Sequence, residues 1–571
     1  MMLRAPNESP HSRVRQWEAA GTNLARSLAA YVDSCRNLSV EKVEKTLGTR
    51  NLVSKLDHML GSLHVELEQQ ITQSRCTLAR LRNKLAGTFY SIPEEILAEI
   101  FTLVVYDRAG CEIRFMEDDI SAFYRRLNTL LAVCSVWRKV GTSHGALWTL
   151  IPMISRKSGW LTQPAAERSY ENAGGHRLHL AASIEKEVRS AFAESIWRNI
   201  RRFQSINVAF ESKSLLIRAI SILFRRDEAL NALTELYLYY YFEPSKEIGI
   251  SVPEPHEFLT SPDPSDLSSL SISQTFRSLR TLRLKNIHIH WQLITLPNLV
   301  ELRIESVMIG TKSNFKQLLI ALQTAPQLQK LELISLNTRL DPYYVSAPVQ
   351  LSIPLPNLQR LYLGDLLSDD AELVLRSIIA DSYRVSLYLT IKMASVIDTD
   401  SVTGLTHVGL DGLTSILQGR EVDTLLIKGD VAWVNWVDIE AFRELLHTLP
   451  LVTTLKLDLW EFGQSEWEAL TQPKDGTTFC KLCSVCIFNI RLDPQEEAMR
   501  SLENFLASHP IHHLTFGGTI GSFDTSDRID WMPIKASSQI TRWLKSKAPN
   551  IELLDDGYIP PEFRTNYWEL W

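Results

Sequence analysis

The apolar residues between Leu52 and Leu85 follow a helical spacing. They recur at steps of three or four residues, apart from one longer gap spanning Ser74, and are Leu52, Leu56, Leu60, Leu63, Leu67, Ile71, Leu78, Leu81 and Leu85. With Ser74 counted, the mean step is about 3.67 residues, so this apolar stripe drifts little on a straight helix. Two interpretations remain open: a coiled coil that makes the chain a homo-oligomer, or a helix that packs its stripe on its own chain. The absence of a strict 3.5-residue repeat favours the second.

A shorter and more apolar helix is predicted from the segment SIPEEILAEIFTLVV, residues 91–105. Pro93 occupies its first turn, where the missing N–H of proline costs nothing. A second helix is predicted in LNTLLAVCSVWRKVGTS, residues 127–143, and the segment HGALWTL, residues 144–150, follows it. Residues 107–126 between the two helices are polar and acidic in the middle, and they predict a loop insertion.

The rest of the chain repeats the pattern apolar-x-x-apolar-x-apolar. Its copies are Phe203-Ile206-Val208, Leu233-Leu236-Leu238, Leu279-Leu282-Leu284, Leu299-Leu302-Ile304, Leu328-Leu331-Leu333, Leu358-Leu361-Leu363, Val422-Leu425-Ile427, Val452-Leu455-Leu457, Leu482-Val485-Ile487 and Ile511-Leu514-Phe516. Successive middle residues are mostly 29 or 30 residues apart, with one interval of 20 and wider intervals of 46 and 64. The widest interval holds two weaker copies, near Leu387 and Val408. The interval of 46 holds a Pro/Ser-rich stretch, which predicts an insertion at 243–275.

Helical patterns occupy the intervals between these copies, as in NFKQLLIALQTAP and VDIEAFRELLHTLP. Each unit therefore predicts a strand, a loop, a helix and a second loop. The strands of successive units should stack in parallel, because no single unit can bury its leucines alone. An ordinary α/β sheet is the alternative, and the regular spacing favours the repeat stack.

Alternate residues of such strands face away from the buried leucines and line the opposite, concave surface. On the copies above these residues include Glu235, Tyr237, Tyr239, Thr281, Arg283, Lys285, Glu301, Arg303, Glu305, Lys330, Glu332, Arg360, Tyr362, Lys456 and Asp458. Tyrosine and arginine are frequent anchors of protein interfaces. The residues predicted to bind a protein target are Tyr237, Tyr239, Arg283, Arg303, Arg360, Tyr362 and Lys456. The opposing interpretation is that exposed strand faces are polar anyway and most of these side chains touch no partner.

The segment 89–150 resembles the F-box, a small three-helix module. The matching residues are Pro93, Glu95, Ile96, Leu97, Ile100, Phe101, Val133, Cys134, Trp137, Arg138, Leu147 and Trp148. The departures are Ile92 in place of the first leucine of the family pattern, and the acidic insertion. The resemblance implies docking on the Skp-type linker protein of a cullin ubiquitin ligase, through Ile92, Pro93, Glu95, Ile96, Leu97, Ile100 and Trp137. The alternative is that these residues form only the core of a helical hairpin.

The recurring apolar pattern resembles the leucine-rich repeat. The asparagine that usually follows the strand in that family is mostly missing, which leaves the curvature of the stack open. The predicted fold class is α/β, with a helical N-terminus and a solenoid built from a curved parallel β-sheet and outer helices. The predicted domains are a disordered tail at 1–20, a helical, coiled-coil-like segment at 21–86, an F-box at 87–152 and the repeat solenoid at 153–571.

Composition and charge narrow the class of protein. The 571-residue chain is 45% hydrophobic and 22% charged, which is typical of a globular protein. A net charge of −6 gives no reason to expect nucleic-acid binding. The chain has no apolar run of about 20 residues for a membrane span and no apolar core of a secretory signal near its start. Seven cysteines, an odd and sparse set, suit a reducing compartment, so we expect a soluble cytoplasmic or nuclear protein.

Candidate chemistry is weak. Cys480, Cys483 and Cys486 have metal-like spacing without a fourth ligand nearby, and His288 and His290 could pair on one face without a third. No nucleophile-elbow, P-loop or dinucleotide-binding motif occurs. We therefore expect no catalytic residues, metal or cofactor. The leading hypothesis is the substrate-recognition adaptor of a Skp–cullin–F-box ubiquitin ligase, followed by a protein-binding repeat scaffold without that role. A metal-dependent enzyme is a weaker third.

Overall fold

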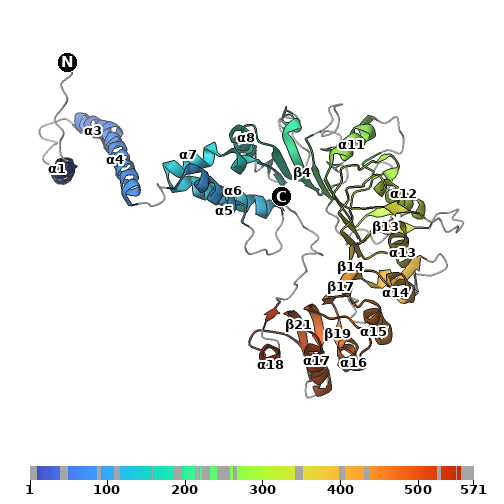
Figure 1. The fold of residues 1–571 in the computed structure, drawn as a ribbon. Helices are drawn as coiled ribbons and strands as arrows, with labels where there is room; N and C mark the ends of the chain where they lie inside the picture. Colours follow the sequence, from blue (N-terminus) through green and yellow to red (C-terminus); the bar gives the residue numbers. More distant parts are fainter. Residues whose placement is uncertain are drawn as a thin grey trace. The chain divides into compact units, whose positions relative to one another are not determined.

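The computed structural model describes residues 10–38, 49–86, 92–107, 116–156, 159–160, 163–184, 194, 196, 198–212, 215–216, 219–220, 232–240, 258–260, 267–340, 351–397, 405–429, 436–523, 529–547 and 550–554. Two compact units make up the chain, Met1–Leu97 and Ala98–Trp571. Figure 1 shows helices in the first and a long sheet with helices in the second.

The first unit is helical. Its elements are α1 (Pro10–Arg36), α3 (Thr49–His58), the π-helical turn η1 (Met59–Leu63) and α4 (His64–Ala86). The predicted long helix is present, but η1 interrupts it, because the His64 N–H donates to the carbonyl of Met59 five residues back. The expected disorder at 1–20 is wrong for residues 10–20, which begin α1. Their alanine, arginine and glutamate residues favour a helix. Residues 1–9 lie outside the described part of the chain.

Three α-helices and a 3-10 turn precede the sheet: α5 (Glu94–Val105), α6 (Met116–Val133), α7 (Ser135–Ser143) and η3 (Gly145–Trp148). The loop predicted at 107–126 is wrong over 116–126, which belongs to α6. The acidic residues lie in the first turn of α6, where negative charge is favourable, and Ile120, Phe123 and Leu127 are buried at helical spacing. The single helix predicted at 127–143 is broken at Cys134, whose extended backbone caps α7.

Seventeen strands of the described residues form one sheet. Its main ladder is parallel and runs through β1 (Leu150–Arg156), β3 (Leu178–Ile184), β4 (Phe203–Phe210), β5 (Glu235–Tyr240), β6 (Thr281–Lys285), β7 (Glu301–Glu305), β9 (Lys330–Ile334), β12 (Arg360–Gly364), β14 (Arg384–Leu389), β17 (Val422–Lys428), β18 (Thr454–Asp458), β20 (Ser484–Leu492), β21 (His513–Phe523) and β23 (Ile551–Leu553). The edges add β2 (Gly159–Trp160), antiparallel to β1, and β22 (Ile529–Pro533), antiparallel to β21, while β19 (Glu461–Phe462) pairs with β20.

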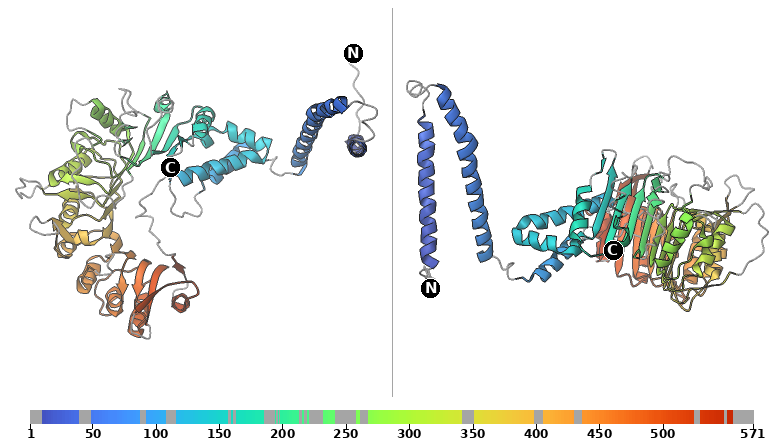
Figure 2. Two further views of the ribbon diagram at one scale, coloured as in Figure 1. Left: turned by 180° about the vertical axis from the view of Figure 1, so that it is seen from behind. Right: turned by 90° about the horizontal axis from the view of Figure 1, so that it is seen from above.

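Helices connect the strands and lie on one face of the sheet, the outer side of its curve in Figure 1 and in the left view of Figure 2. They are α8 (Gln163–Asn172), α11 (Leu267–Ser278), α12 (Lys312–Leu322), α13 (Ser368–Ser377), α14 (Asp411–Leu417), α15 (Ile439–Thr448), α16 (Gln464–Leu470), α17 (Glu496–Ser508) and α18 (Gln539–Lys547), with 3-10 turns η4 (Ile200–Arg202), η6 (Trp291–Leu293) and η7 (Ile391–Ala394). Three short sheets join the connections: β8 (Met308–Thr311) with β10 (Asn337–Arg339), β11 (Ile353–Pro354) with β13 (Ile378–Ile379), and β15 (Ser395–Ile397) with β16 (Leu405–His407). The predicted fold class is confirmed.

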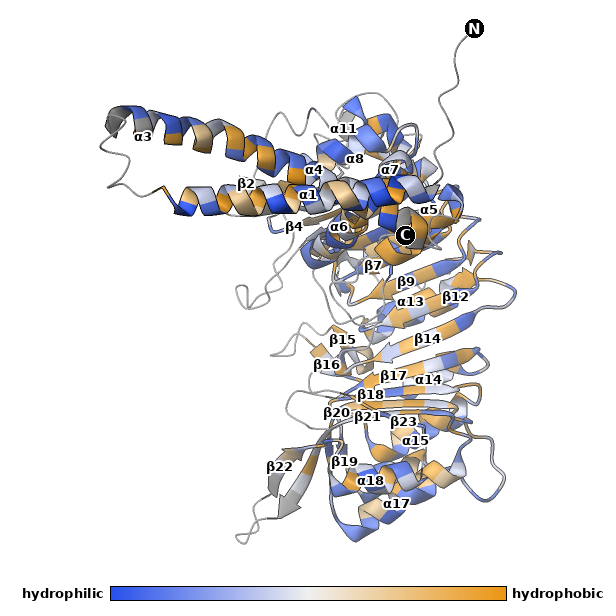
Figure 3. Cartoon of the chain, turned by 90° about the vertical axis from the view of Figure 1, so that its left-hand side faces the viewer, coloured by the Kyte–Doolittle hydropathy of each residue, from blue (hydrophilic) through white to orange (hydrophobic). Residues whose placement is uncertain are grey.

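The repeated leucines form the core of this stack. Leu282, Leu302, Leu331 and Leu361 occupy the same level on successive strands, and each is fully buried. Hydrophobic and hydrophilic residues alternate along strands such as β12 and β14 (Figure 3). Burying every second residue on the helical side leaves the other face, the concave face, to polar side chains.

A left-handed residue follows each of five strands. Asn286, Ser306, Ser335, Asp365 and Leu459 have φ of 55°, 56°, 52°, 52° and 56°, a conformation uncommon outside glycine. The backbone N–H groups of Asn286 and Ser306 donate to the last carbonyls of the next strands, Glu305 and Ile334, at 3.0 and 2.9 Å. The ladder thus extends one residue beyond these two strands. Asparagine fills the left-handed position at Asn286, and serine, aspartate or leucine fills it in the other four.

Three sequence expectations in the connections need correction or refinement. The weak copy near Leu387 is strand β14, but Val408 follows β16, which pairs with β15 outside the main sheet. Of the insertion predicted at 243–275, residues 267–275 belong to α11, while most of the rest lies outside the described residues. The 20-residue interval between Leu282 and Leu302 has room only for the turn η6. No helix within the described residues is long and apolar enough to cross a membrane.

Candidate functional site

Helix α5 exposes an apolar face. Ile96, Ile100, Leu103 and Val104 are 54%, 39%, 66% and 42% exposed. The opposite positions, Leu97, Phe101 and Val105, are buried at steps of four residues. A twelve-residue helix with apolar residues nearly all round normally buries both sides. Exposed apolar residues gathered in one place are typical of an interaction surface.

The residues predicted to bind a linker protein differ in exposure: some lie on this exposed face of α5 and others are buried. Pro93, Glu95, Ile96 and Ile100 are exposed, and Ile92 is half-buried. Leu97 is buried, so it supports α5 rather than offering a side chain to a partner. Whether these residues bind anything remains a prediction.

Trp137 and Trp148 have structural contacts. The Trp137 ring lies 5.0 Å from the ring of Phe101, centroid to centroid, and is half-buried. The backbone N–H of Trp137 donates to the Cys134 sulfur, which fixes the first turn of α7. The Trp148 indole N–H donates to the Gly141 carbonyl at 2.7 Å. The two indoles therefore hold α5, α7 and η3 in place.

On the concave face, the register brings the predicted target-binding residues into rows. Tyr237, Arg283, Arg303, Glu332 and Tyr362 lie level on β5, β6, β7, β9 and β12. The row through Tyr239 and Lys285 continues through Glu305 to Ile334, and Lys456 lies on the distant strand β18. Six of the seven predicted residues thus gather on β5 to β12, and Lys456 is separate from them.

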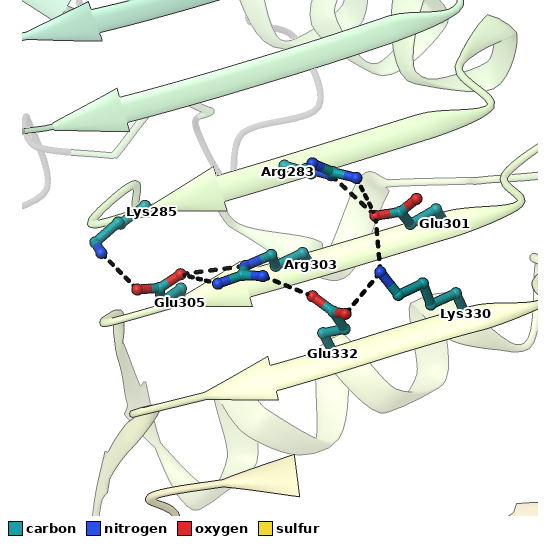
Figure 4. Close-up of polar contacts among 7 residues, drawn as sticks. All are labelled: Arg283, Lys285, Glu301, Arg303, Glu305, Lys330 and Glu332. Carbon is teal, nitrogen blue, oxygen red and sulfur yellow. Dashed lines mark hydrogen bonds and ion pairs between the residues drawn. The ribbon is translucent and has the colours of Figure 1, made fainter. Parts of the chain in front are cut away.

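Seven charged residues on β6, β7 and β9 pair with one another (Figure 4). The Arg303 guanidinium bridges Glu305 and Glu332 at 2.8 and 3.0 Å. Arg283 pairs with Glu301 at 2.8 Å, Lys285 with Glu305 at 2.5 Å, and Lys330 with Glu332 at 2.8 Å. We call this group, Arg283, Lys285, Glu301, Arg303, Glu305, Lys330 and Glu332, the charge network.

Burial and pairing both shape the electrostatics of the charge network. All its side chains except Lys330 are less than one-fifth exposed. Burial alone would raise the pKa of Glu332, but Arg303 and Lys330 outweigh it, so the pKa lies below its ordinary value. For Lys285 burial outweighs the attraction of Glu305, and the pKa is lowered. Arg303 and Glu332 thus form an ion pair that is largely buried, in which Glu332 keeps its negative charge at neutral pH.

Two tyrosines cover cations at the edge of the charge network. The Arg283 guanidinium lies 5.1 Å from the centre of the Tyr237 ring, and the Lys285 ammonium lies 5.3 Å from that of Tyr239. Cations over aromatic faces are mutually stabilising. Burial raises the pKa of Glu235 on the same strand, although Tyr237 donates a hydrogen bond to it.

Arg360 is the exposed cation among the predicted target-binding residues. It lies level with Lys330 on β9 and Arg384 on β14, so three cations stand side by side. Arg384 is 68% exposed and reaches Asp423 only at 3.8 Å. Like charges opposite each other on neighbouring strands are destabilising. Lys330 is paired with Glu332, so Arg360 and Arg384 are the exposed cations of this row.

The sequence analysis correctly placed the carboxylates of the charge network on the concave face, but it did not predict that they pair with the neighbouring arginines. Glu301, Glu305 and Glu332 neutralise the arginines that were singled out as binding residues. The available signal was the alternation of acid and base at matched positions of successive repeats.

The cysteine and histidine clusters have structural surroundings. Burial raises the pKa of the Cys480 thiol to about 12, and Cys486 is also buried. His288 is bonded through Nδ1 to the Met308 carbonyl, and the His290 ring stacks on Phe258 at 4.0 Å. Within the described residues, no three histidine, cysteine or acidic side chains come together as metal ligands.

Comparison with solved structures finds similarity at low sequence identity. No protein-family model matches the chain, and no curated protein matches it. A crystal structure of the leucine-rich repeat-containing protein LegL7 from Legionella pneumophila is similar at 11% identity, with a TM-score of 0.27, over 70% of this chain and 97% of that one. A similarity of this size supports no further argument. The solenoid fold is established by the strand register and the buried leucines.

Proposed function

We propose that the chain is a non-catalytic adaptor. The face of α5 binds the Skp-type linker of a cullin ubiquitin ligase, and the concave face binds a protein target. Chemistry would be supplied by other subunits, and the adaptor would act by holding the target near them.

The exposed apolar face of α5 supports this proposal best. Ile96, Ile100 and Leu103 lie on a helix whose other side is already packed, so the face is free to enter an interface. The core of a protein interface is enriched in apolar residues and depleted of charge. The F-box resemblance of the same segment supplies the nature of the partner.

The test is a pull-down of the full chain with a purified Skp-type linker. We expect Leu103→Asp to lower the affinity at least tenfold, because it places a charge in the apolar interface. Leu103 is a better choice than Leu97, whose substitution would disturb the buried side of α5. Ile320→Asp on α12 is the control, since Ile320 is another exposed apolar residue, 40% exposed, but lies among the repeats.

The concave face is tested in a second pull-down, from a cell extract that contains the target. Arg360→Glu should leave linker binding unchanged and abolish recovery of the target, because it reverses the exposed charge of the row. Failure of the unmodified chain to bind the linker would end the ligase proposal. A repeat scaffold that binds a protein through its concave face would then be the remaining function.

A further inference from the structure

Helix α4 has an exposed apolar stripe. Ile71, Leu78, Leu81 and Leu85 are 40%, 37%, 52% and 80% exposed, and they follow one another at helical spacing. This exposure argues against the expectation that the stripe packs on its own chain. An apolar stripe of this length on a surface helix needs a cover.

The charges beside the stripe are segregated by sign. Glu66 and Glu68 lie in the first half of α4, and Arg75, Arg80 and Arg82 lie in the second half, all of them exposed. A partner helix that complements this pattern needs cations at the level of Glu66 and acidic residues at the level of Arg82.

Helix α1 of the same chain meets that need only in part. The rings of Tyr31 on α1 and His64 on α4 lie 5.9 Å apart, centre to centre. If the two helices run antiparallel, this contact fixes which residue of α1 lies opposite which residue of α4. Continuing α1 along α4 from that contact would bring Arg13 to the level of Arg82 and Arg15 to that of Arg80. Glu18 and Arg26 would come level with Thr77 and Gln69, where they suit the charges nearby. At the C-terminal end of α4, however, like charges would face each other.

We propose that two copies of the chain pair through α4, antiparallel, with Ser74 beside the two-fold axis. A second copy of α4 running the other way supplies the required pattern. Its first, acidic half lies along the second, basic half of the other copy, so that Glu66 comes level with Arg82 and Glu68 with Arg80.

The same arrangement aligns the apolar residues. With Ser74 facing Ser74, Leu67 of one copy faces Leu81 of the other, and the two helices overlap over nearly their whole length. Serine at the crossing is small enough for a close approach of the two backbones. A parallel pair would instead align like charges along both halves, which selects the antiparallel sense.

Sedimentation equilibrium of the full chain tests the pairing. We expect a mass of twice 65.0 kDa at micromolar concentration. Leu78→Asp should raise the dimer dissociation constant at least a hundredfold, while Gln69→Asp, on the opposite side of α4, should leave it unchanged. Monomer in the unmodified chain, or equal effects of the two variants, would overturn the proposal.

Disulfide cross-linking tests the direction, in chains whose exposed Cys35 and Cys76 are replaced by serine. Ser74→Cys should cross-link to itself on mild oxidation, and Gln69→Cys should not. A mixture of Leu67→Cys and Leu81→Cys chains should give the mixed dimer. If each of these two variants cross-links only to itself, the helices are parallel and the proposal is wrong.

Charge reversal tests the electrostatic argument separately. Glu66→Arg with Glu68→Arg should weaken the dimer, because basic residues then face Arg80 and Arg82. Adding Arg80→Glu and Arg82→Glu should restore it. Linker binding by the α5 face serves as an independent readout, so loss of the dimer can be distinguished from failure of the proposed function.

Discussion

At the scale of single residues, the concave face is a set of compensated charges. Arg303 pairs with Glu305 and Glu332, and Arg283 pairs with Glu301 and lies over the Tyr237 ring. These two arginines were predicted to bind a target because arginine is a frequent interface anchor. In the structure they instead pair with residues of neighbouring strands and so stabilise the sheet. The exposed cation Arg360, one strand beyond, remains available to a partner.

Glu332 gives a pH-dependent prediction. Its pKa is lower in the folded chain than the ordinary value of 4.5. A lowered carboxyl pKa stabilises the fold above the ordinary pKa, and this contribution is lost as the pH falls through the folded value. Urea unfolding at pH 7 and in a series below pH 4.5 should therefore show a loss of stability on acidification.

Glu332→Gln should remove part of that pH dependence and cost about 2 kcal/mol at pH 7, because Arg303 keeps Glu305 as a partner. Glu496→Gln is the control, since Glu496 is 75% exposed and pairs with Arg500 on its own helix. A variant with the same acid slope as the unmodified chain would show that Glu332 is not an internal ion pair.

At the scale of elements, buried polar contacts fasten one repeat to the next. Lys312 at the start of α12 donates to Asp370 on α13 at 2.6 Å, and Asp370 also accepts from Thr338 on β10 at 2.6 Å. Lys392 donates to the carbonyls of Leu336 and Asp365 nearby. Burial raises the pKa of Asp370 even though Lys312 opposes it. Asp370 therefore depends on its lysine partner.

This dependence predicts a non-additive pair of substitutions. Lys312→Met alone should lower the free energy of unfolding by about 3–5 kcal/mol, because it leaves a buried carboxylate without its cation. Lys312→Met with Asp370→Leu should recover most of that loss, since both charges are then gone. Urea unfolding of the two single variants and the double variant measures the coupling. Additive losses would contradict the buried pair.

Element boundaries were the weakest sequence predictions, for local reasons. The acids of 116–126 indicated a loop, but they lie in the first turn of α6 and complement its dipole. Cys134 lay within one predicted helix, at residues 127–143, yet its extended backbone starts another. The segment around Val408 matches the repeat pattern, but its strand β16 pairs with β15 outside the main sheet. A short sequence pattern does not determine which strand it pairs with.

At the scale of the whole molecule, the repeats should unfold together. Successive units share a continuous ladder and a continuous row of buried leucines, so each unit stabilises its neighbours. Cys480, fully buried and with its thiol pKa raised to about 12, reports opening of the C-terminal repeats.

We expect a thiol reagent at pH 7 to modify the exposed Cys35 and Cys76 in the folded chain and to leave Cys480 unmodified. In increasing urea, Cys480 should become reactive at the concentration at which the circular dichroism of the sheet is lost. Mass spectrometry of the labelled peptides measures both. Reactivity of Cys480 well below that concentration would show that the C-terminal repeats open on their own.

The sequence by itself determined the repeat fold. The apolar pattern recurs mostly every 29 or 30 residues and can be read from the sequence alone. Units of such regular length bury all their leucines when their strands stack in parallel. The tertiary structure alone decided which charges of the concave face neutralise each other and which helix faces stay exposed. Those outcomes depend on contacts between residues far apart in the chain, and a side chain's type does not specify its neighbours.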